Sequence, residues 1–416
     1  MTNKSKRISR VCRHAAILMF GLGFLSSASF ARDIGFAEDP LKIGVGARPM
    51  GMGKAFVAVA DDENSLFVNP AGLSYVKDWT FTSMYTSFLG DVNYVALGFI
   101  YPSSFLKNGV SAIGYLSSSV PDIISPGQGG FSYSNYYNNV LLLSTSSVPY
   151  PNLAFGATLK YFSQGFSGAI DSAGTGVDLD LGAKWDIDRQ LSLGLNLQNI
   201  LPSSLGGNIL WPNGDEQRVP PLANIGIKCE TEDGKIIIGL DSDLELERKL
   251  PGTTHLGVEW KFHPQLSIRG GVDQSVDAVT GGTASNLTLG LGLKIGAIKL
   301  DYAYHPYFEE TGNITHYISL SFSGPPFVQK TANVPTPEVM AVSTPEAAAV
   351  SPEAAPKPAQ PAPVVVYEVR AGDTLGKIAL KFYKVKNQDV IMKIARYNLI
   401  ADPDKISIGQ RIVIPK

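Results

Sequence analysis

Apolar and polar residues alternate with a period of two along most of the chain between residues 79 and 322. The clearest case is Asn286 to Ile295, NLTLGLGLKI, in which every odd-numbered residue is apolar and every even-numbered residue is polar or glycine. Residues 177–185, 191–198 and 256–262 repeat the pattern. Because neighbouring side chains of a strand point to opposite faces, this pattern predicts β-strands with one apolar and one polar face.

The alternation divides into segments separated by turn residues, mostly of the roughly 9–11 residues that a tilted membrane-spanning strand needs. From the third segment onward, short links alternate with longer ones, as periplasmic turns and outer loops do in outer-membrane barrels. We predict an all-β transmembrane barrel of about 14 antiparallel strands over 79–324, with a soluble β-sandwich as the alternative. The predicted strands cover 79–89, 92–101, 109–119, 135–148, 152–165, 174–185, 191–200, 221–230, 235–246, 253–262, 266–274, 284–295, 297–305 and 313–322.

The first 31 residues have the pattern of an export signal. A basic start is followed by an apolar core from Ala15 to Leu25 and by a small-x-small site, Ser29-Phe30-Ala31. This order predicts a signal peptide over 1–31 that is cleaved after Ala31. The apolar core is too short for a spanning helix, which needs about 20 residues.

A turn-rich segment of small residues lies between the export signal and the first strand. It includes Gly46 to Leu73, GARPMGMGKAFVAVADDENSLFVNPAGL. Asp61 or Asp62 is expected to cap a short helix that Asn69-Pro70 stops. We interpret residues 32–78 as a hatch packed inside the barrel, with a helix-turn segment on a soluble sheet as the alternative.

This stretch resembles the N-terminal signature of the PorV/PorQ outer-membrane proteins. Those proteins are relatives of the FadL-type long-chain fatty-acid transporters, whose barrels have an N-terminal hatch with an Asn-Pro-Ala turn. Asn69, Pro70 and Ala71 match that turn, and Gly72 follows it. The resemblance implies a hatch built around these four residues.

The composition changes after the last strand. Residues 325–363 are rich in proline and alanine and hold one aromatic residue, so they are expected to form an extended linker. Residues 364–416 again have the pattern of a folded domain, with a strand, two helices and a strand. Leu375, Ile378, Ala379 and Phe382 follow the spacing of an amphipathic helix, which Asp373 or Thr374 is expected to cap.

This small α+β unit (βααβ) resembles a LysM domain. The matching pieces are YEVRAGDTLGKIALKFY, Asn398, DPDKI and GQRIVIP. The resemblance implies binding of N-acetylglucosamine-containing glycans, chiefly peptidoglycan or chitin, in a groove between two loops. In this chain those loops supply Gly372, Asp373, Thr374, Leu375, Ile400, Ala401, Asp402 and Pro403. For Asp373 and Thr374, helix capping alone is the alternative role.

Charge and motif content exclude several classes of function. The 31 residues of the export signal hold five of the 35 basic residues and no acid, so 30 basic residues face 37 acidic ones in the remainder, a formal charge of −7. A mildly acidic chain without a basic cluster argues against nucleic-acid binding. The phosphate-loop, H-E-x-x-H and G-x-S-x-G motifs are absent, so we expect no enzymatic activity, no cofactor and no metal centre.

Two clusters remain open to more than one interpretation. Asp241, Asp243, Glu245 and Glu247 lie on one face of one predicted strand, either as a cation site or as a wet part of the lumen wall balanced by Arg248 or Lys249. Aromatic residues crowd one outer loop, either as a contact for a ligand or partner or as part of an interfacial girdle. They are Phe131, Tyr133, Tyr136 and Tyr137.

The sequence therefore predicts an outer-membrane barrel of a Gram-negative-type bacterium, tethered to peptidoglycan by a LysM domain in the periplasm. FadL-like transport of hydrophobic compounds would need an apolar pocket beside Met50, Met52, Phe56 and Phe67. PorV-like protein secretion would instead involve secretion-system proteins as partners. A structural anchor between the outer membrane and peptidoglycan is the alternative to both. Outer-membrane lipid is an expected partner in every case.

Overall fold

A computed structural model describes the barrel and parts of the C-terminal unit. The described residues are 39–88, 92–103, 109–127, 130–169, 171–247, 251–276, 282–307, 313–325, 365–369, 373–383, 391, 394–395, 398, 400 and 411–414. The predicted export signal lies outside them, as does the predicted linker apart from Pro325. The chain divides into two units, residues 1–333 and 334–416.

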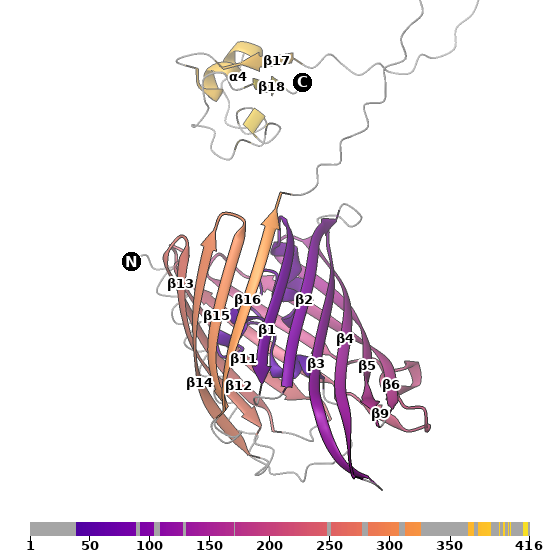
Figure 1. Cartoon of the computed structure of the whole chain (residues 1–416). Helices are drawn as coiled ribbons and strands as arrows, with labels where there is room; N and C mark the ends of the chain where they lie inside the picture. Colours follow the sequence, from indigo (N-terminus) through magenta and orange to yellow (C-terminus); the bar gives the residue numbers. More distant parts are fainter. Residues whose placement is uncertain are drawn as a thin grey trace, which may run out of the picture. The chain divides into compact units, whose positions relative to one another are not determined.

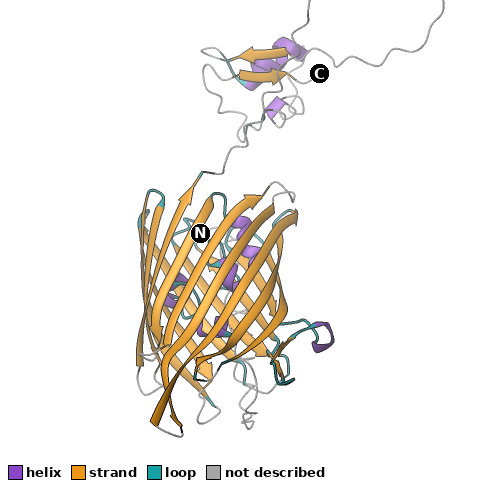
Figure 2. Cartoon of the chain, turned by 45° about the vertical axis from the view of Figure 1, so that its right-hand side comes forward, coloured by secondary structure: helices purple, strands orange, loops and turns teal. Residues whose placement is uncertain are grey.

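Fourteen antiparallel strands form a closed barrel (Figures 1 and 2). The first strand pairs with the last, with Trp79 opposite Gly324, so the sheet has no open edge. The prediction of a 14-stranded antiparallel barrel is confirmed. The strands are β1 (Trp79–Phe88), β2 (Val92–Ser103), β3 (Gly109–Gly127), β4 (Gly130–Tyr150), β5 (Leu153–Gly168), β6 (Ser172–Asp186), β7 (Leu191–Gln198), β10 (Leu222–Glu230), β11 (Ile236–Glu245), β12 (Thr253–His263), β13 (Leu266–Val276), β14 (Thr283–Ile295), β15 (Ile298–Tyr307) and β16 (Asn313–Gly324).

Two features of the barrel go beyond the predicted strands. β3 and β4 continue past their expected ends at 119 and 135 and form a long two-stranded hairpin (Figure 1). The segment expected to link β7 to the next barrel strand holds a 3-10 helix, η4 (Ser203–Leu205), and a small hairpin of β8 (Asn208–Leu210) and β9 (Glu216–Arg218). The hairpin joins the sheet through the pairing of Leu210 with Thr175 of β6.

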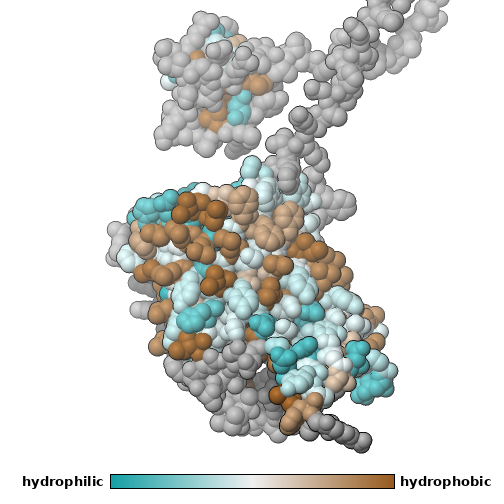
Figure 3. Space-filling view, in the orientation of Figure 1, coloured by the Kyte–Doolittle hydropathy of each residue, from teal (hydrophilic) through white to brown (hydrophobic). Residues whose placement is uncertain are grey.

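The alternating pattern places apolar side chains on the outside of the barrel. On β14, Leu287 and Leu289 are 67% and 62% exposed, whereas Asn286 and Thr288, which alternate with them, are buried. Figure 3 shows apolar side chains gathered in a band across the outer face. Such a band suits the hydrocarbon layer of a membrane, and the polar side chains face inward.

The hatch lies inside the barrel, where Figures 1 and 2 show its short helices. It consists of η2 (Pro40–Ile43), α2 (Ala47–Gly51), α3 (Ser65–Val68) and η3 (Pro70–Tyr75). α3 begins later than expected, because Asn64 is its N-cap residue and the side chain of Asp62 accepts a hydrogen bond from the Asn64 backbone N–H. The helix ends before Asn69 and Pro70, as predicted. Within the described ranges, every helix is too short or too polar to cross a membrane.

The second unit has its own small core. β17 (Val365–Glu368) pairs with β18 (Arg411–Ile414), and α4 (Leu375–Tyr383) packs Leu375, Ile378 and Ala379 against them. The amphipathic spacing of α4 therefore predicted its buried face correctly. Most of the expected second helix (388–397) lies outside the described residues; Ile391, Ile394 and Ala395 are helical there.

Candidate functional site

A belt of inward-facing glycines receives the hatch. Eight consecutive barrel strands, from β5 round to β14, each contribute one glycine whose missing side chain leaves room for hatch atoms. A Cβ at Gly194 would lie 2.6 Å from the Val57 carbonyl oxygen, and one at Gly239 would lie 2.6 Å from that of Ala55. The glycine belt comprises Gly156, Gly182, Gly194, Gly226, Gly239, Gly257, Gly271 and Gly290.

The hatch chain follows this belt strand by strand. Gly51 lies against Gly290 of β14, Met52 against Gly257 of β12, and the next residues pass β11, β10 and β7 in turn. Pro70 then reaches Gly156 of β5. Because the wall residues at these points are glycines, the hatch backbone packs closely on the backbone of the wall along most of the belt.

The predicted Asn-Pro-Ala-Gly turn forms a corner of the hatch. The Asn69 amide donates to the carbonyl oxygens of Val57 (2.9 Å) and Ala183 of β6 (3.3 Å), and its oxygen accepts from the Ala71 N–H (3.2 Å). Gly72 is required because a Cβ there would lie 2.5 Å from the Ser65 hydroxyl oxygen. These residues therefore hold two parts of the hatch together and fix them to the wall.

Arg48 is the centre of a buried ion-pair network. Its guanidinium contacts Asp61 (2.5 Å) and Asp62 (2.8 Å) in the hatch and makes a two-point pair with Glu259 of β12. Glu259 also accepts from Arg269 of β13 (2.7 Å). Each buried acid therefore has a cation beside it, as buried charges require.

Lys299 of β15 extends this network to the other side of the hatch. Its ammonium group lies 2.6 Å from Asp62 and 3.1 Å from Glu63, and Glu63 accepts a hydrogen bond from Ser321 of β16 (2.7 Å). Burial alone would raise the pKa of the Asp62 carboxyl. The charges of Lys299 and Arg48 outweigh this effect and hold its pKa well below the ordinary value.

Two further buried clusters attach the hatch to the barrel wall. Lys54 pairs with Asp273 of β13 (3.1 Å), which also contacts His255 of β12 and His305 of β15 (both 2.8 Å). Asp39, at the start of the hatch, pairs with Lys160 of β5 (3.0 Å). Sequence reasoning missed all three networks, because their members are far apart in the chain and follow no motif.

The acidic residues on β11 and just after it have separate partners. Asp241 is buried, and its Oδ2 accepts from the backbone N–H groups of Phe56 (2.5 Å) and Val57 (2.7 Å), so this carboxylate fastens the hatch rather than lining a wet wall. Asp243 contacts His255 (3.3 Å), and Glu247 pairs with Arg218 (2.6 Å). Arg248 and Lys249, the expected balancing cations, lie outside the described residues. Over the described ranges, no group of three or more His, Cys, Asp or Glu side chains is placed to hold a metal ion.

The wall formed by β2 to β5 carries nine buried apolar side chains that pack in one cluster, and the buried Lys160 of β5 lies on the same wall. Leu66 of α3 lies over Gly98 and Gly114, where Cβ atoms would be 2.9 and 3.1 Å from its Cδ2. The buried inward-facing residues of this apolar wall are Tyr94, Ala96, Ile100, Val110, Ala112, Leu116, Val140, Leu142 and Phe162.

The four residues expected around one apolar pocket do not form one site. Met50 and Phe67 belong to the buried cluster that includes the apolar wall. Met52 and Phe56 belong to a second buried cluster, with Ile237 of β11.

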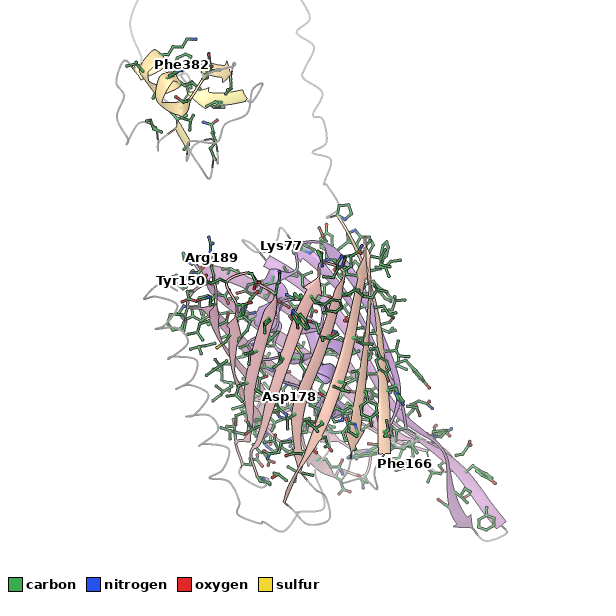
Figure 4. The ribbon with its side chains drawn as sticks, turned by 90° about the vertical axis from the view of Figure 1, so that its left-hand side faces the viewer. Lys77, Tyr150, Phe166, Asp178, Arg189 and Phe382 are labelled. Carbon is green, nitrogen blue, oxygen red and sulfur yellow. The ribbon has the colours of Figure 1, made fainter. Side chains whose placement is uncertain are left out.

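The expected outer aromatic cluster lies on β4, in or next to the extended hairpin. Phe131 and Tyr133 are exposed, at 75% and 57%. Tyr136 packs against Phe166 of β5 with ring centroids 5.2 Å apart. Figure 4 shows Phe166 near this end of the barrel, opposite the end that carries Lys77, Tyr150 and Arg189.

In the C-terminal unit, the two candidate capping residues have different roles. Thr374 caps α4, since its hydroxyl accepts from the Lys377 N–H (3.3 Å). Asp373 instead accepts a hydrogen bond from the Tyr367 hydroxyl of β17 (2.8 Å). Leu375 is buried in the core and Ile400 packs against it. Gly372, Ala401, Asp402 and Pro403 lie outside the described residues.

Residues 367–415 match the family model of the LysM domain. The C-terminal unit is a LysM domain. Its Asn398 joins the helical region to β18, donating to the Val413 carbonyl (2.7 Å) and accepting from the Val413 N–H (2.7 Å). The secreted LysM effector slp2 of Pyricularia oryzae is 51% identical over 53 residues. This match covers 13% of the present chain and only 17% of that protein, so the likeness is confined to the LysM domain.

The barrel has the fold of the FadL-type channels. The Pseudomonas putida toluene transporter TodX superposes with a TM-score of 0.50 at 12% identity, over 70% of this chain and 99% of that one. The Ralstonia pickettii toluene transporter TbuX gives a TM-score of 0.47 at 12% identity (67% and 98% covered), and a Pseudomonas aeruginosa FadL homologue 0.44 at 13% (71% and 99%). At these identities the likeness is one of fold.

Proposed function

We propose that this protein is an outer-membrane channel for hydrophobic compounds that is held to the cell wall by its LysM domain. The observation that carries the proposal is the apolar wall of β2 to β5 inside a barrel of FadL type. Most of an aqueous pore would be lined by polar groups, which favour water and ions. The apolar wall instead favours hydrophobic compounds, which partition readily out of water.

The orientation follows from the barrel's own asymmetry. Links at the end carrying Trp79, Tyr150 and Gly324 are mostly short, whereas the extended β3–β4 hairpin and the β8–β9 insertion lie at the opposite end. Short turns face the periplasm in barrels of this kind. β16 ends at the short-turn end, so this orientation brings the linker and the LysM domain to the periplasm, where peptidoglycan is the available N-acetylglucosamine-containing glycan.

Two measurements test the proposal. Cells lacking the protein and cells expressing it are compared for uptake of radiolabelled toluene and of a labelled C12 fatty acid, each at low concentration. Purified full-length protein in detergent is then sedimented with isolated peptidoglycan sacculi, with a chain ending at Pro325 as the control. Equal uptake in both cell types contradicts the channel, and equal sedimentation of both chains contradicts the tether.

A structural anchor is the second candidate, and the glycine belt favours it. Backbone-to-backbone packing over eight strands makes the hatch part of the wall, which suits a plugged barrel that only links two envelope layers. An anchor predicts no uptake of either probe but a loss of envelope integrity when the LysM domain is deleted. Co-purification of exported proteins or secretion components, without uptake, would favour the role suggested by the PorV/PorQ resemblance of residues 46–73.

A further inference from the structure

The β3–β4 hairpin is almost without charge. Over the full length of both strands, from Gly109 to Tyr150, Asp122 is the only aspartate, glutamate, lysine, arginine or histidine. Serine, asparagine, glycine and tyrosine make up most of residues 117–139. Protein surfaces that face water usually carry many charged side chains of both signs. The composition of this hairpin instead suits a neighbour that is polar and uncharged.

The apolar band of the barrel ends well before the tip of this hairpin. Ile113 and Leu143 form an exposed outward pair of β3 and β4 within the band. Nearer the loop end, the Tyr115 hydroxyl donates to the side-chain oxygen of Asn139 (3.2 Å). Tyrosines mark the interface between membrane and water in barrels of this kind. From Asn139 to Phe131 the strand continues for roughly 26 Å, at about 3.3 Å per residue, so the tip lies beyond the band.

Apolar side chains return on the outward face at the tip. Ile124 and Tyr133 pair across the hairpin, and Phe131 follows two residues from Tyr133, so the three share one face. All three are exposed, and we call them the hairpin patch. β4 pairs with β5 without a register shift from Leu143 to Ser134, so the alternation carries the lipid-facing side of Leu143 through to Phe131. The hairpin patch therefore continues the face that meets lipid lower down.

The hairpin patch is turned toward the membrane surface. The bulge at Asp122, whose N–H donates to the side-chain oxygen of Asn135 (3.0 Å), bends the two strands. Figure 4 shows the hairpin slanting away from the barrel wall at the loop end. When a pair of wall strands slants outward, its outward face turns toward the plane of the membrane. The hairpin patch thus overhangs the lipid head groups beside the barrel.

The edge of the hairpin is closed to a partner strand. Among the described residues, β2 pairs with β3 only as far as Ser119, so the outer part of β3 has a free edge. Pro121 has no N–H to donate, and the bulge at Asp122 interrupts the regular pairing. Both are devices that block pairing between sheet edges. The contact surface is therefore the face of the hairpin, which argues against an added peptide strand.

Neutral sugars fit this face better than phosphate groups do. The apolar ring faces of sugars pack on aromatic side chains, and serine and asparagine side chains offer uncharged donors and acceptors to sugar hydroxyls. Phosphate recognition would call for arginine or lysine, and these two strands have neither.

We propose that the hairpin patch binds the neutral sugars of an outer-leaflet glycolipid beside the barrel. This inference rests on the orientation given in the proposed function, with the loop end outside the cell, and adds a lipid partner to it. The polar side chains of the same face complete the surface. They are Ser117, Ser119, Asn135 and Asn139.

Binding is measured on the full-length protein in detergent, with chitin pentamer in excess to compete for the LysM domain. The probes are the polysaccharide released by mild acid from the outer-membrane glycolipid of the native cells, the remaining lipid A, and nanodiscs of phosphatidylglycerol. Phe131→Ser with Tyr133→Ser removes both rings of the hairpin patch. Tyr150→Ser is the matched control, because Tyr150 is an exposed aromatic residue at the short-turn end. Faster gel migration before heating verifies the folded barrel in each protein.

We expect wild type and Tyr150→Ser to bind the released polysaccharide equally and the double variant to bind it at least tenfold more weakly. Equal affinity of all three proteins, or no binding by wild type, overturns the proposal. Binding of lipid A or nanodiscs that the double variant loses, without binding of the polysaccharide, assigns the hairpin patch to lipid phosphates and overturns it as well.

The orientation has a separate test. Ser125→Cys on the hairpin is treated in intact cells with a membrane-impermeant maleimide, and the signal is compared with that of wild type. We expect labelling of intact cells. Labelling only after lysis overturns the orientation and the glycolipid partner with it. The uptake assays described above bear on the channel alone, so failure of the channel and failure of the glycolipid contact are distinguishable.

Discussion

Arg48 of the hatch and Glu259 of β12 form a two-point ion pair inside the barrel, with Nε–Oε1 and Nη2–Oε2 distances of 3.1 and 2.7 Å. Both side chains are almost fully buried, at 6% and 1% exposure. The pair connects the hatch to a wall strand more than two hundred residues away in the chain. Glu259 also binds Arg269, so the hatch and two adjacent strands share one carboxylate.

Replacing Arg48 by methionine should destabilise the folded barrel strongly. The substitution removes the ion pair of Asp61, leaves Asp62 paired with Lys299 and takes one of two arginines from Glu259. Breaking a buried pair by removing one partner typically costs about 3–5 kcal/mol. We expect the temperature at which the detergent-solubilised protein loses its fast-migrating folded band to fall clearly. The transition temperature of Arg48→Lys should lie between those of wild type and Arg48→Met, because lysine keeps the charge but cannot make the two-point contact.

The glycine belt provides a matched pair of adjacent residues on β13. A methyl group at Gly271 would overlap the Gly53 nitrogen and the Met52 carbonyl carbon, whereas at Gly270 the nearest atom would be 3.8 Å away. Gly271→Ala should therefore destabilise the barrel by about 1–3 kcal/mol, the usual cost of overpacking. Gly270→Ala should be neutral or slightly stabilising. Urea unfolding in detergent micelles measures both, and equal midpoints for the two variants would contradict the backbone contact.

The Asp62 carboxylate should make the attachment of the hatch resistant to mild acid. Its pKa is lowered in the folded protein, so its contribution is complete above the unfolded pKa of about 3.9 and is lost only as pH falls through the lower folded value. Thermal midpoints of wild type and Asp62→Asn, measured from pH 7 to pH 3, test this sign. We expect the difference between the two to stay constant down to about pH 4 and to shrink below it. A difference that disappears near pH 6 would contradict the lowered pKa.

In the LysM domain, Asn398 should contribute to stability rather than to glycan contact. Its amide donates to the carbonyls of Ile394 and Val413 and accepts from the Val413 N–H. The backbone N–H of residue 398 still bonds the Ile394 carbonyl in Asn398→Ala, but the Val413 N–H and carbonyl lose their side-chain partner, at a cost of about 1–3 kcal/mol. Thermal unfolding of a fragment starting at residue 334, which contains its own core, measures the loss. The affinity for chitin oligomers, measured well below the new midpoint, should stay unchanged.

Tyr367 should affect glycan binding through Asp373. Its hydroxyl holds the Asp373 carboxylate beside the loop that precedes α4. Tyr367→Phe removes this bond and keeps the ring, which packs against Phe382 at 5.4 Å. We expect a severalfold weaker affinity for chitin pentamer or solubilised peptidoglycan, from the loss of about 1 kcal/mol. Isothermal titration of the full-length protein measures it, and an unchanged affinity would place Asp373 outside the binding surface.

The strands were predictable because membrane barrels impose a strict rule on each residue. Leu287 and Leu289 lie exposed on the outer face, where a membrane barrel needs apolar side chains, and this requirement recurs at every second residue of a strand. The rule failed where the β3–β4 hairpin extends past the expected strand ends. At Asp122, with φ of 54°, the register of β3 and β4 shifts between Val120 and Ile123. The alternation breaks at this bulge, although the two strands continue beyond it.

The attachment of the hatch was hidden from the sequence for a different reason. Gly271 and Gly270 look alike in the chain, and only the position of Met52 and Gly53 separates their roles. From the sequence alone, Asp241 could equally belong to an exposed acidic face or accept hydrogen bonds from two backbone N–H groups. Contacts between distant segments are set by the closed shape of the barrel, which no local pattern contains.

The glycine belt also dictates an order of assembly. The hatch precedes the strands in the chain, and its contacts extend around the wall from Gly98 of β2 to Ser321 of β16, whereas closure requires the pairing of β1 with β16. A barrel that closed first would surround unpaired buried charges, which is costly. We therefore expect the strands to gather around the hatch before Trp79 pairs with Gly324, so that the hatch acts as a template for the barrel.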